Sequence, residues 1–264
     1  AGRVAGASTP TQITRGRRCS HIVGTAHFFP YSFRRPLTRL FRPVSVVLTE
    51  GPLDEASSQR IAEYGRTGAN DLPSQLSHAA IWRIEKALRQ AANHQGEAWL
   101  IPMSDPIYFE TYTTGVRPWA AFFSIWATCL SWPYSMDAEG YDIAVRSGKR
   151  VIALESLEEQ LAVLDGIPVE RIVRQLDEAE GWDAYRREYV RLFMAGDLEG
   201  IVAQTARFVT RGPVVVGVRD QRMFAAMQPV FDAEDAVAFV GFPHVPGVTQ
   251  LFRDAGYGVE QVTA

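Results

Sequence analysis

Short apolar runs rich in β-branched residues recur along the chain and predict β-strands. Five of them lie at residues 19–26, 44–49, 151–154, 236–240 and 259–262. A further apolar run, residues 214–218, ends directly before Arg219 and is interpreted in the same way. The Gly-, Ser- and Thr-rich residues 1–18 show no such run, so we expect a disordered N-terminal segment there.

Segments with apolar residues at helical spacing separate these runs. Helices are expected at residues 55–64, 79–93, 118–132, 137–147, 168–180, 182–195, 197–210, 221–230 and 248–255. Asp54 and Ser77 are candidate N-caps for the first two, and Ser156 with Glu159 makes a capping box after the strand at 151–154. The segment 28–43 contains three prolines and predicts a loop with at most a short helix.

Strands that alternate with helices predict an α/β fold with a central, mostly parallel sheet. The middle of the chain, about residues 105–210, is rich in predicted helices. No Pro-, Ser- or Gly-rich linker flanks it, so we interpret it as a helical insertion and expect residues 19–264 to form one domain.

Composition and charge narrow the classes of function. The 264 residues are 47% hydrophobic and carry a net charge of -3, which gives no electrostatic basis for binding nucleic acid. The most apolar stretch, residues 119–132, is too short to cross a bilayer, so no transmembrane segment is expected. Cys19 and Cys129 cannot form a disulfide framework, which favours the cytoplasm, and a secreted or periplasmic location stays open if a leader was removed. A homodimer is left open.

One five-residue pattern, V-G-x-x-H, occurs near both ends of the chain. It ends at His27 in the first copy and at His244 in the second, and each copy follows a predicted strand. Chance is the competing explanation for so short a pattern. Three more polar residues follow predicted strands, namely Glu50, Glu155 and Arg219. The carboxyl ends of parallel strands are where sites form in open α/β sheets, so we expect these five residues to meet at one edge.

Two imidazoles with one or two carboxylates make a sufficient ligand set for a divalent metal ion. We assign His27, His244 and Glu50 as candidate ligands, and this nitrogen and oxygen set suits Mn, Co, Fe or Zn. Glu50 and Glu155 are candidate catalytic carboxylates, and Arg219 is a candidate for stabilising an oxyanion. The alternatives are structural: strand-end glutamates cap helices, and Arg219 has Asp220 beside it as a partner.

Aromatic residues supply the candidate contacts with a substrate. Phe28 and Tyr31 follow His27 in the loop at the expected strand end, where loops carry function. Trp119 begins an aromatic cluster at helical spacing, for which a place in the core is the simpler explanation and an apolar wall beside the site the alternative.

Ordered blocks from residue 20 to residue 262 resemble one protein family. They are V-G-T-A-H at 23–27, L-T-E-G-P-L-D at 48–54, R-P-W-A at 117–120, G-K-R-V-I-A-L-E at 148–155, V-G-F-P-H-V-P-G at 240–247 and G-Y-G-V at 256–259. In this order and spacing they resemble the TraB/PrgY/GumN family, relatives of the Tiki metalloproteases. The chain departs from the family at Arg219-Asp220, where Arg-Asn is usual.

The resemblance implies an α/β fold related to erythromycin esterase and the haem-associated ChaN proteins. It implies two related halves that each contribute one G-x-x-H, and a divalent-metal-dependent hydrolase that is a peptidase in the Tiki relatives. His27, Glu50, Glu155, Arg219 and His244 are the positions that match the family's site.

Two hypotheses for function follow. The first is a metal-dependent hydrolase that cleaves peptide or amide bonds in a peptide or small-molecule substrate. The alternative is a non-catalytic module that binds a peptide signal or a haem-like ligand on the same surface, favoured by the aromatic and arginine-rich loop at residues 28–41.

Overall fold

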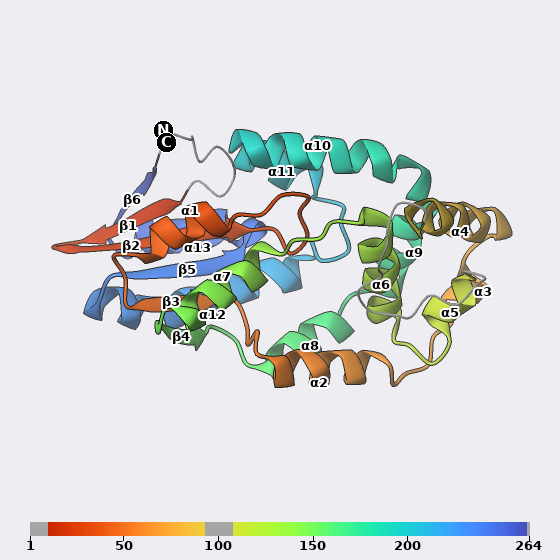
Figure 1. Ribbon diagram of the computed structural model, residues 1–264, viewed down its shortest axis with the longest axis horizontal. Coiled ribbons are helices and arrows are strands. Elements are labelled where there is room, and N and C mark those ends of the chain that lie inside the picture. Colours follow the sequence, from red (N-terminus) through yellow and green to blue (C-terminus); the bar gives the residue numbers. More distant parts are fainter. Residues whose placement is uncertain (1–9, 93–107, 263–264) are drawn as a thin grey trace.

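A six-stranded sheet forms the centre of the computed structural model, which describes residues 10–92 and 108–262 (Figure 1). The strand order is β4-β3-β5-β2-β1-β6. The strands are β1 (Thr11–Arg15), β2 (Arg18–Thr25), β3 (Val46–Thr49), β4 (Arg150–Ala153), β5 (Ala236–Gly241) and β6 (Gly258–Gln261). Because β4, β3, β5 and β2 run parallel to one another, the predicted mostly parallel sheet is confirmed.

The register of β2 and β5 places the two V-G-x-x-H copies side by side. Gly24 is opposite Val240 and Thr25 is opposite Gly241, so the copies differ by one residue in register. Strand β3 pairs with the other side of β5, and β4 pairs with β3. The parallel strands therefore end at one edge in the order β4, β3, β5, β2, and the residues after them emerge together.

The first strand corrects the prediction for the N-terminal segment. Residues 11–15 form β1, which pairs with β2 and β6, so the disorder predicted for residues 1–18 does not extend over them. Thr11 and Ile13 alternate with less buried neighbours, and Gly16 adopts a φ of 60° in a two-residue turn that joins Arg15 to Arg18. A glycine at positive φ suits such hairpins, and this signal was present in the sequence. Residues 1–9 lie outside the described part.

Helices cover both faces of the sheet. The helices are α1 (Arg34–Phe41), α2 (Glu55–Gly65), α3 (Leu72–Gln75), α4 (His78–Ala92), α5 (Phe109–Thr113), α6 (Pro118–Leu130), α7 (Met136–Arg146), α8 (Leu157–Asp165), α9 (Val169–Asp177), α10 (Trp182–Ala195), α11 (Leu198–Gln204), α12 (Pro213–Ala233) and α13 (Val245–Asp254), with 3-10 helices η1 (Ala179–Gly181) and η2 (Phe242–His244). Helices α1 and α7 pack on one face, where Phe41 contacts Phe239 and Ile143 belongs to the same apolar cluster. Helices α12 and α13 pack on the other, where Met227 and Phe252 are enclosed.

A separate helical end extends beyond the carboxyl edge of the sheet. Helices α3, α4, α5, α6 and α9 gather there around a third apolar core that includes Phe122 and Trp126 (Figure 1). The predicted helical insertion at residues 105–210 supplies much of this end, and it also supplies β4, the strand at one border of the sheet. Strand β4, which the sequence predicted at residues 151–154, therefore connects this helical segment to the sheet.

The largest difference from the sequence prediction concerns residues 214–218. They were expected to form a strand, but they belong to the first turns of α12. Pro213 lies at the start of this helix, where its fixed φ and missing N–H are compatible with helix geometry. Met223, Met227 and Phe231 are buried at intervals of four residues. Packing of this stripe against the sheet favours a helix over the strand that the β-branched run predicts.

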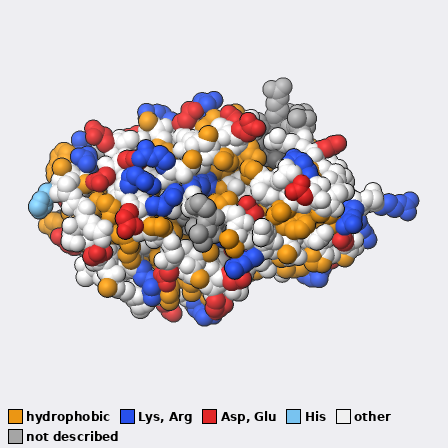
Figure 2. Space-filling view, turned by 180° about the vertical axis from the view of Figure 1, so that it is seen from behind, with side chains coloured by type: hydrophobic (Ala, Val, Ile, Leu, Met, Phe, Trp, Pro, Cys, Tyr) orange, Lys and Arg blue, Asp and Glu red, His pale blue; other side chains and the backbone are white. Residues whose placement is uncertain are grey.

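Helix starts follow the predicted caps. The Asp54 carboxylate accepts the Ser57 N–H at 3.0 Å, the Ser77 hydroxyl accepts the Ala80 N–H at 3.1 Å, and Ser156 and Glu159 make the capping box. The segment 28–43 contains the single short helix α1. In the described residues no helix is long and apolar enough to cross a membrane. Acidic and basic side chains are interspersed over the back of the molecule (Figure 2).

Candidate functional site

Four predicted residues follow the four parallel strands and are brought to one edge of the sheet. Glu155 follows β4 closely, Glu50 follows β3, His244 lies in η2 after β5, and His27 follows β2. The pairing of β3 and β4 continues past their ends, since the Glu155 N–H donates to the Glu50 carbonyl at 3.0 Å. Arg219 reaches the same edge from α12, a helix, and not from the strand that was predicted.

Arg219 connects three of these residues through its guanidinium group. Its Nε donates to Glu155 Oε1 at 2.7 Å and its Nη2 donates to Glu155 Oε2 at 2.6 Å, which is a bidentate pair. Nη2 also donates to Glu50 Oε1, and Nη1 donates to His244 Nε2 at 3.2 Å. Arg219 and Glu155 are 7% and 3% exposed, so this ion pair is shielded from water.

The Glu50 carboxylate is held in its ionised form. Burial alone raises the pKa of a carboxyl group, but Arg219, His244 and His27 outweigh burial and lower the pKa of Glu50 to about 2. The backbone N–H of Gly241 also donates to Glu50 Oε2 at 2.7 Å. A Cβ at position 241 would lie 3.1 Å from that oxygen, so this glycine allows the close approach. Glu50 is therefore an anion that interacts electrostatically with both imidazoles.

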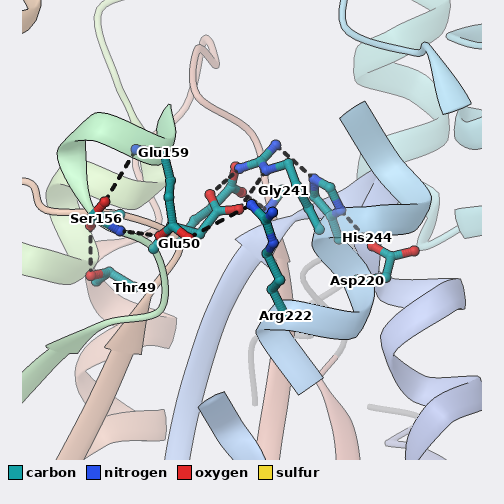
Figure 3. A network of polar contacts seen from close by, with 11 residues as sticks. Thr49, Glu50, Ser156, Glu159, Asp220, Arg222, Gly241 and His244 are labelled. Carbon is teal, nitrogen blue, oxygen red and sulfur yellow. Dashed lines mark hydrogen bonds and ion pairs between the residues drawn. The ribbon is translucent and has the colours of Figure 1, made fainter. Parts of the chain in front are cut away.

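His244 has a carboxylate on the other side of its ring. The Asp220 Oδ1 lies 2.6 Å from His244 Nδ1, and both side chains are buried. Because Asp220 accepts from Nδ1, the ring nitrogen Nε2 carries the lone pair that faces Arg219. Asp220 is the next residue after Arg219 on α12, so one helix turn supplies both neighbours of this imidazole (Figure 3).

His27 repeats this arrangement on the neighbouring strand. Its Nδ1 lies 2.9 Å from Oδ2 of Asp137, a buried residue at the start of α7. The Asp137 carboxylate stabilises the protonated imidazole and raises the pKa of His27 to about 9. The His27 side chain is 63% exposed, whereas that of His244 is 4% exposed. The open side of the site is therefore at His27, and both imidazoles have a carboxylate that orients Nδ1.

The donor types at this edge fit a divalent metal ion. A histidine that binds a metal through one nitrogen characteristically donates its other N–H to a carboxylate, as both histidines do here. Among residues 10–92 and 108–262, however, no three His, Cys, Asp or Glu side chains are grouped closely enough to hold an ion. The cation between Glu50 and His244 is the guanidinium of Arg219.

The three aromatic residues predicted to contact substrate lie in different places. Phe28 packs against the core of the helical end, and Tyr31 is 55% exposed in the loop after His27. Trp119 is 7% exposed, and its Nε1 donates to Asp165 at 2.9 Å. Its surroundings are those of a core residue. Contact of any of the three with substrate stays a prediction.

Asp137 was not among the residues that the sequence predicted for the site. Only the structure shows that it lies beside His27. The Met136 N–H donates to the Ala26 carbonyl at 3.2 Å, and the Phe29 N–H donates to the Tyr134 carbonyl at 2.8 Å. These bonds join the chain before α7 to the loop around His27. A separation of 110 residues hides this neighbour from any local pattern.

Gly247 packs against Asp220, the residue whose carboxylate orients His244. A Cβ at this position would lie 1.9 Å from Asp220 Oδ2, so alanine forces the carboxylate to move. We expect Gly247→Ala to lower the free energy of unfolding by roughly 1–3 kcal/mol, as overpacking does in tightly packed sites.

Gly217→Ala on α12 is the control, because a Cβ added at this position would have no atom within 4 Å. This variant should keep or gain about 0.5–1 kcal/mol, since alanine is the better helix former. Urea unfolding of both variants makes the comparison. Equal stabilities would show that Asp220 has room to move.

A comparison of the sequence with family models finds one match. The model described as the TraB/PrgY/gumN family matches residues 11–261. No significant match was found among curated proteins or among solved structures.

Proposed function

The chain belongs to the TraB/PrgY/gumN family, and from its site we propose a hydrolase of peptide or amide bonds that depends on a divalent metal ion. The observation that carries the proposal is the pair of imidazoles on neighbouring strands, each with Nδ1 against an aspartate. His244 Nε2 accepts from the Arg219 guanidinium, and Glu50 is an anion whose pKa is lowered by the charges of both imidazoles. Such an oriented pair with one carboxylate supplies the nitrogen and oxygen donors that Mn, Co, Fe or Zn takes.

In this proposal the ligands are His27, His244 and Glu50, which are not grouped closely enough in the structure to hold an ion and would draw together around it. When bound, the ion would supply Lewis-acid chemistry: it polarises a carbonyl and makes water acidic near neutral pH. Asp137 and Asp220 lie at Nδ1 of the two imidazoles, so Nε2 is the atom that would bind the ion. Binding would replace the Arg219 contact at His244 and a proton at His27. Because the pKa of Glu50 is about 2, Glu50 is a weak base, and a role as ligand suits it better than proton abstraction near pH 7.

Arg219 and Glu155 then act as a unit. Both oxygens of Glu155 accept from Arg219, so Glu155 fixes the plane of the guanidinium. Arg219 presents Nη1 and Nη2 to His244 and Glu50, and these donors are suited to stabilising negative charge that develops on a substrate oxygen. In this role Glu155 is a positioning residue.

Metal content and peptide cleavage test the proposal together. Protein freed of metal with a chelator is dialysed against Mn, Co, Fe(II) or Zn and analysed by mass spectrometry, and cleavage of a mixed peptide library is followed with the same samples. We expect about one ion per chain and metal-dependent cleavage for wild type. His27→Ala and His244→Ala should lose both.

His78→Ala is the matched control, because His78 is exposed at the start of α4 and outside this edge of the sheet. It should retain metal and cleavage. Failure of wild type to bind any of the four ions near stoichiometry rejects the metal centre. Binding of peptides without cleavage in every metal supports the non-catalytic alternative.

A further inference from the structure

Arg211 is an arginine beside the site with no carboxylate partner among the described residues. Its Nη2 donates to the Thr205 hydroxyl at 2.8 Å, and its Nε is enclosed without a hydrogen-bond partner. Its guanidinium carbon lies 4.6 Å from the centroid of the Phe242 ring. Burial lowers the pKa of Arg211 to about 10, so the group still carries its charge at neutral pH.

Phe242 ties this arginine to the site. It lies between Gly241, whose N–H holds Glu50, and His244, two residues further along the chain. On the other side, the Phe242 ring meets that of Tyr189 on α10 at 5.9 Å between centroids. Arg211 also lies within electrostatic reach of Glu50, and Tyr189 within reach of Asp137. Arg211 therefore stands at the border between the helical layer and the sheet edge.

The local structure does not require a cation at this position. The Arg171 side chain donates to the Phe208 carbonyl at 2.8 Å, and the Arg211 backbone N–H donates to the same carbonyl at 3.0 Å. These two bonds hold the turn before α12 without the Arg211 guanidinium, which adds only the bond to Thr205. A cation removed from water without an anionic partner is unfavourable, and an aromatic face offsets only part of this.

The chemistry of the unpaired group indicates its ligand. The remaining nitrogen, Nη1, has no hydrogen bond among the described residues, whereas Arg219 uses all its nitrogens on the site. A planar guanidinium is the best side-chain partner for a carboxylate. We propose that Arg211 binds a carboxylate group of the substrate and so selects peptides that carry one near the cleaved bond. This inference rests on the proposed peptidase function.

The test measures binding without turnover. Wild type and Arg211→Met are dialysed with a chelator against three sets of acetylated tetrapeptides of mixed sequence, and bound peptide is quantified by mass spectrometry. One set has free C-terminal carboxylates and no acidic side chain, one has the same sequences amidated, and one is amidated with a single Glu or Asp. The first and third sets distinguish a terminal from a side-chain carboxylate.

We expect wild type to retain one carboxylate set about 10- to 100-fold better than the amidated set, as for a hydrogen bond to a charged group. Arg211→Met should lose this preference and keep its affinity for the amidated set. Arg207→Met is the matched control from the same turn, because Arg207 pairs with Glu178 at 2.9 Å, and it should keep the preference.

Three results overturn the inference: wild type retains no carboxylate set preferentially, the preference survives in Arg211→Met, or that variant weakens all sets equally, as a purely structural arginine would. Failure of the peptidase proposal is a separate outcome, because it appears as absence of cleavage with metal and leaves the binding preference intact.

Discussion

Arg219→Met is expected to lower the free energy of unfolding by about 3–5 kcal/mol at pH 7.5, the loss typical when one partner of a buried ion pair is removed. The reason is that Arg219 is the common partner of Glu50 and Glu155, whose side chains are only 13% and 1% exposed. Without the guanidinium, two carboxylates remain buried next to each other. Urea unfolding in the presence of a chelator measures the loss.

The pH dependence of this loss has a definite sign. In wild type the pKa of Glu50 is below its ordinary value, so its stabilising effect is present above the ordinary pKa and is lost as the pH falls towards 2. In Arg219→Met the guanidinium no longer lowers the pKa of Glu50, so this pKa should lie above its wild-type value, while His244, His27 and the Gly241 N–H still oppose burial. Wild type then loses more stability than the variant as the pH falls below the ordinary pKa of a glutamate, so the difference between them should shrink there.

Two further variants make the interpretation specific. Arg222→Met changes the arginine one turn further along α12, which is 55% exposed and 3.7 Å from Glu159, and it should alter stability by no more than about 0.5 kcal/mol. Adding Glu155→Gln to Arg219→Met removes one of the orphaned charges and should recover part of the loss. If Arg219→Met and Arg222→Met behave alike, the buried ion pair is not a major contribution to stability.

The sequence predicted most of the sheet because local signals and the fold agree there. The apolar runs before His27, Glu50, Glu155 and His244 are all strands, and their parallel pairing follows from the helices between them. The family resemblance is confirmed over residues 11–261. All five candidate site residues lie at the edge that the sequence predicted, and four of them follow the strands predicted for them.

Arg219 reached the site by a route that the sequence did not predict. The β-branched residues 214–218 favour a strand locally, but α12 is fixed by its packing on the sheet through Met223 and Met227. On a helix, Arg219 and Asp220 contact the two different ring nitrogens of His244, which no strand could arrange with successive residues on opposite faces.

Asp137 and Arg211 show the other limit of sequence reasoning. Asp137 meets His27 only because the chain before α7 pairs with the loop after β2. Arg211 is one of several arginines in its region of the sequence, and in the fold it differs from Arg207 because no described carboxylate forms an ion pair with it. Long-range pairing and the absence of a partner leave no local pattern in a single sequence.

Glu50→Gln is expected to reduce metal-dependent cleavage by at least about 10- to 100-fold, the loss seen when a group that supports a metal site is removed. Glutamine keeps the shape of the side chain and an oxygen for the Gly241 N–H, but it removes the negative charge next to both imidazoles. Affinity for the metal should fall with activity, because the lost charge belongs to a proposed ligand. Steady-state cleavage kinetics and metal titrations of the purified variant measure both.

The pattern across three glutamates tests the division of roles at the site. Glu50→Gln should cost only about 1–3 kcal/mol of stability, since Arg219 keeps its bidentate pair with Glu155. Glu155→Gln should show the larger loss of stability and the smaller loss of metal affinity, because both its oxygens hold Arg219. Glu158→Gln, whose side chain is 69% exposed, should resemble wild type in both measurements. An active, metal-replete Glu50→Gln protein would refute the assignment of Glu50 as a ligand and would move the chemistry to His27, the exposed histidine at the open side of the site.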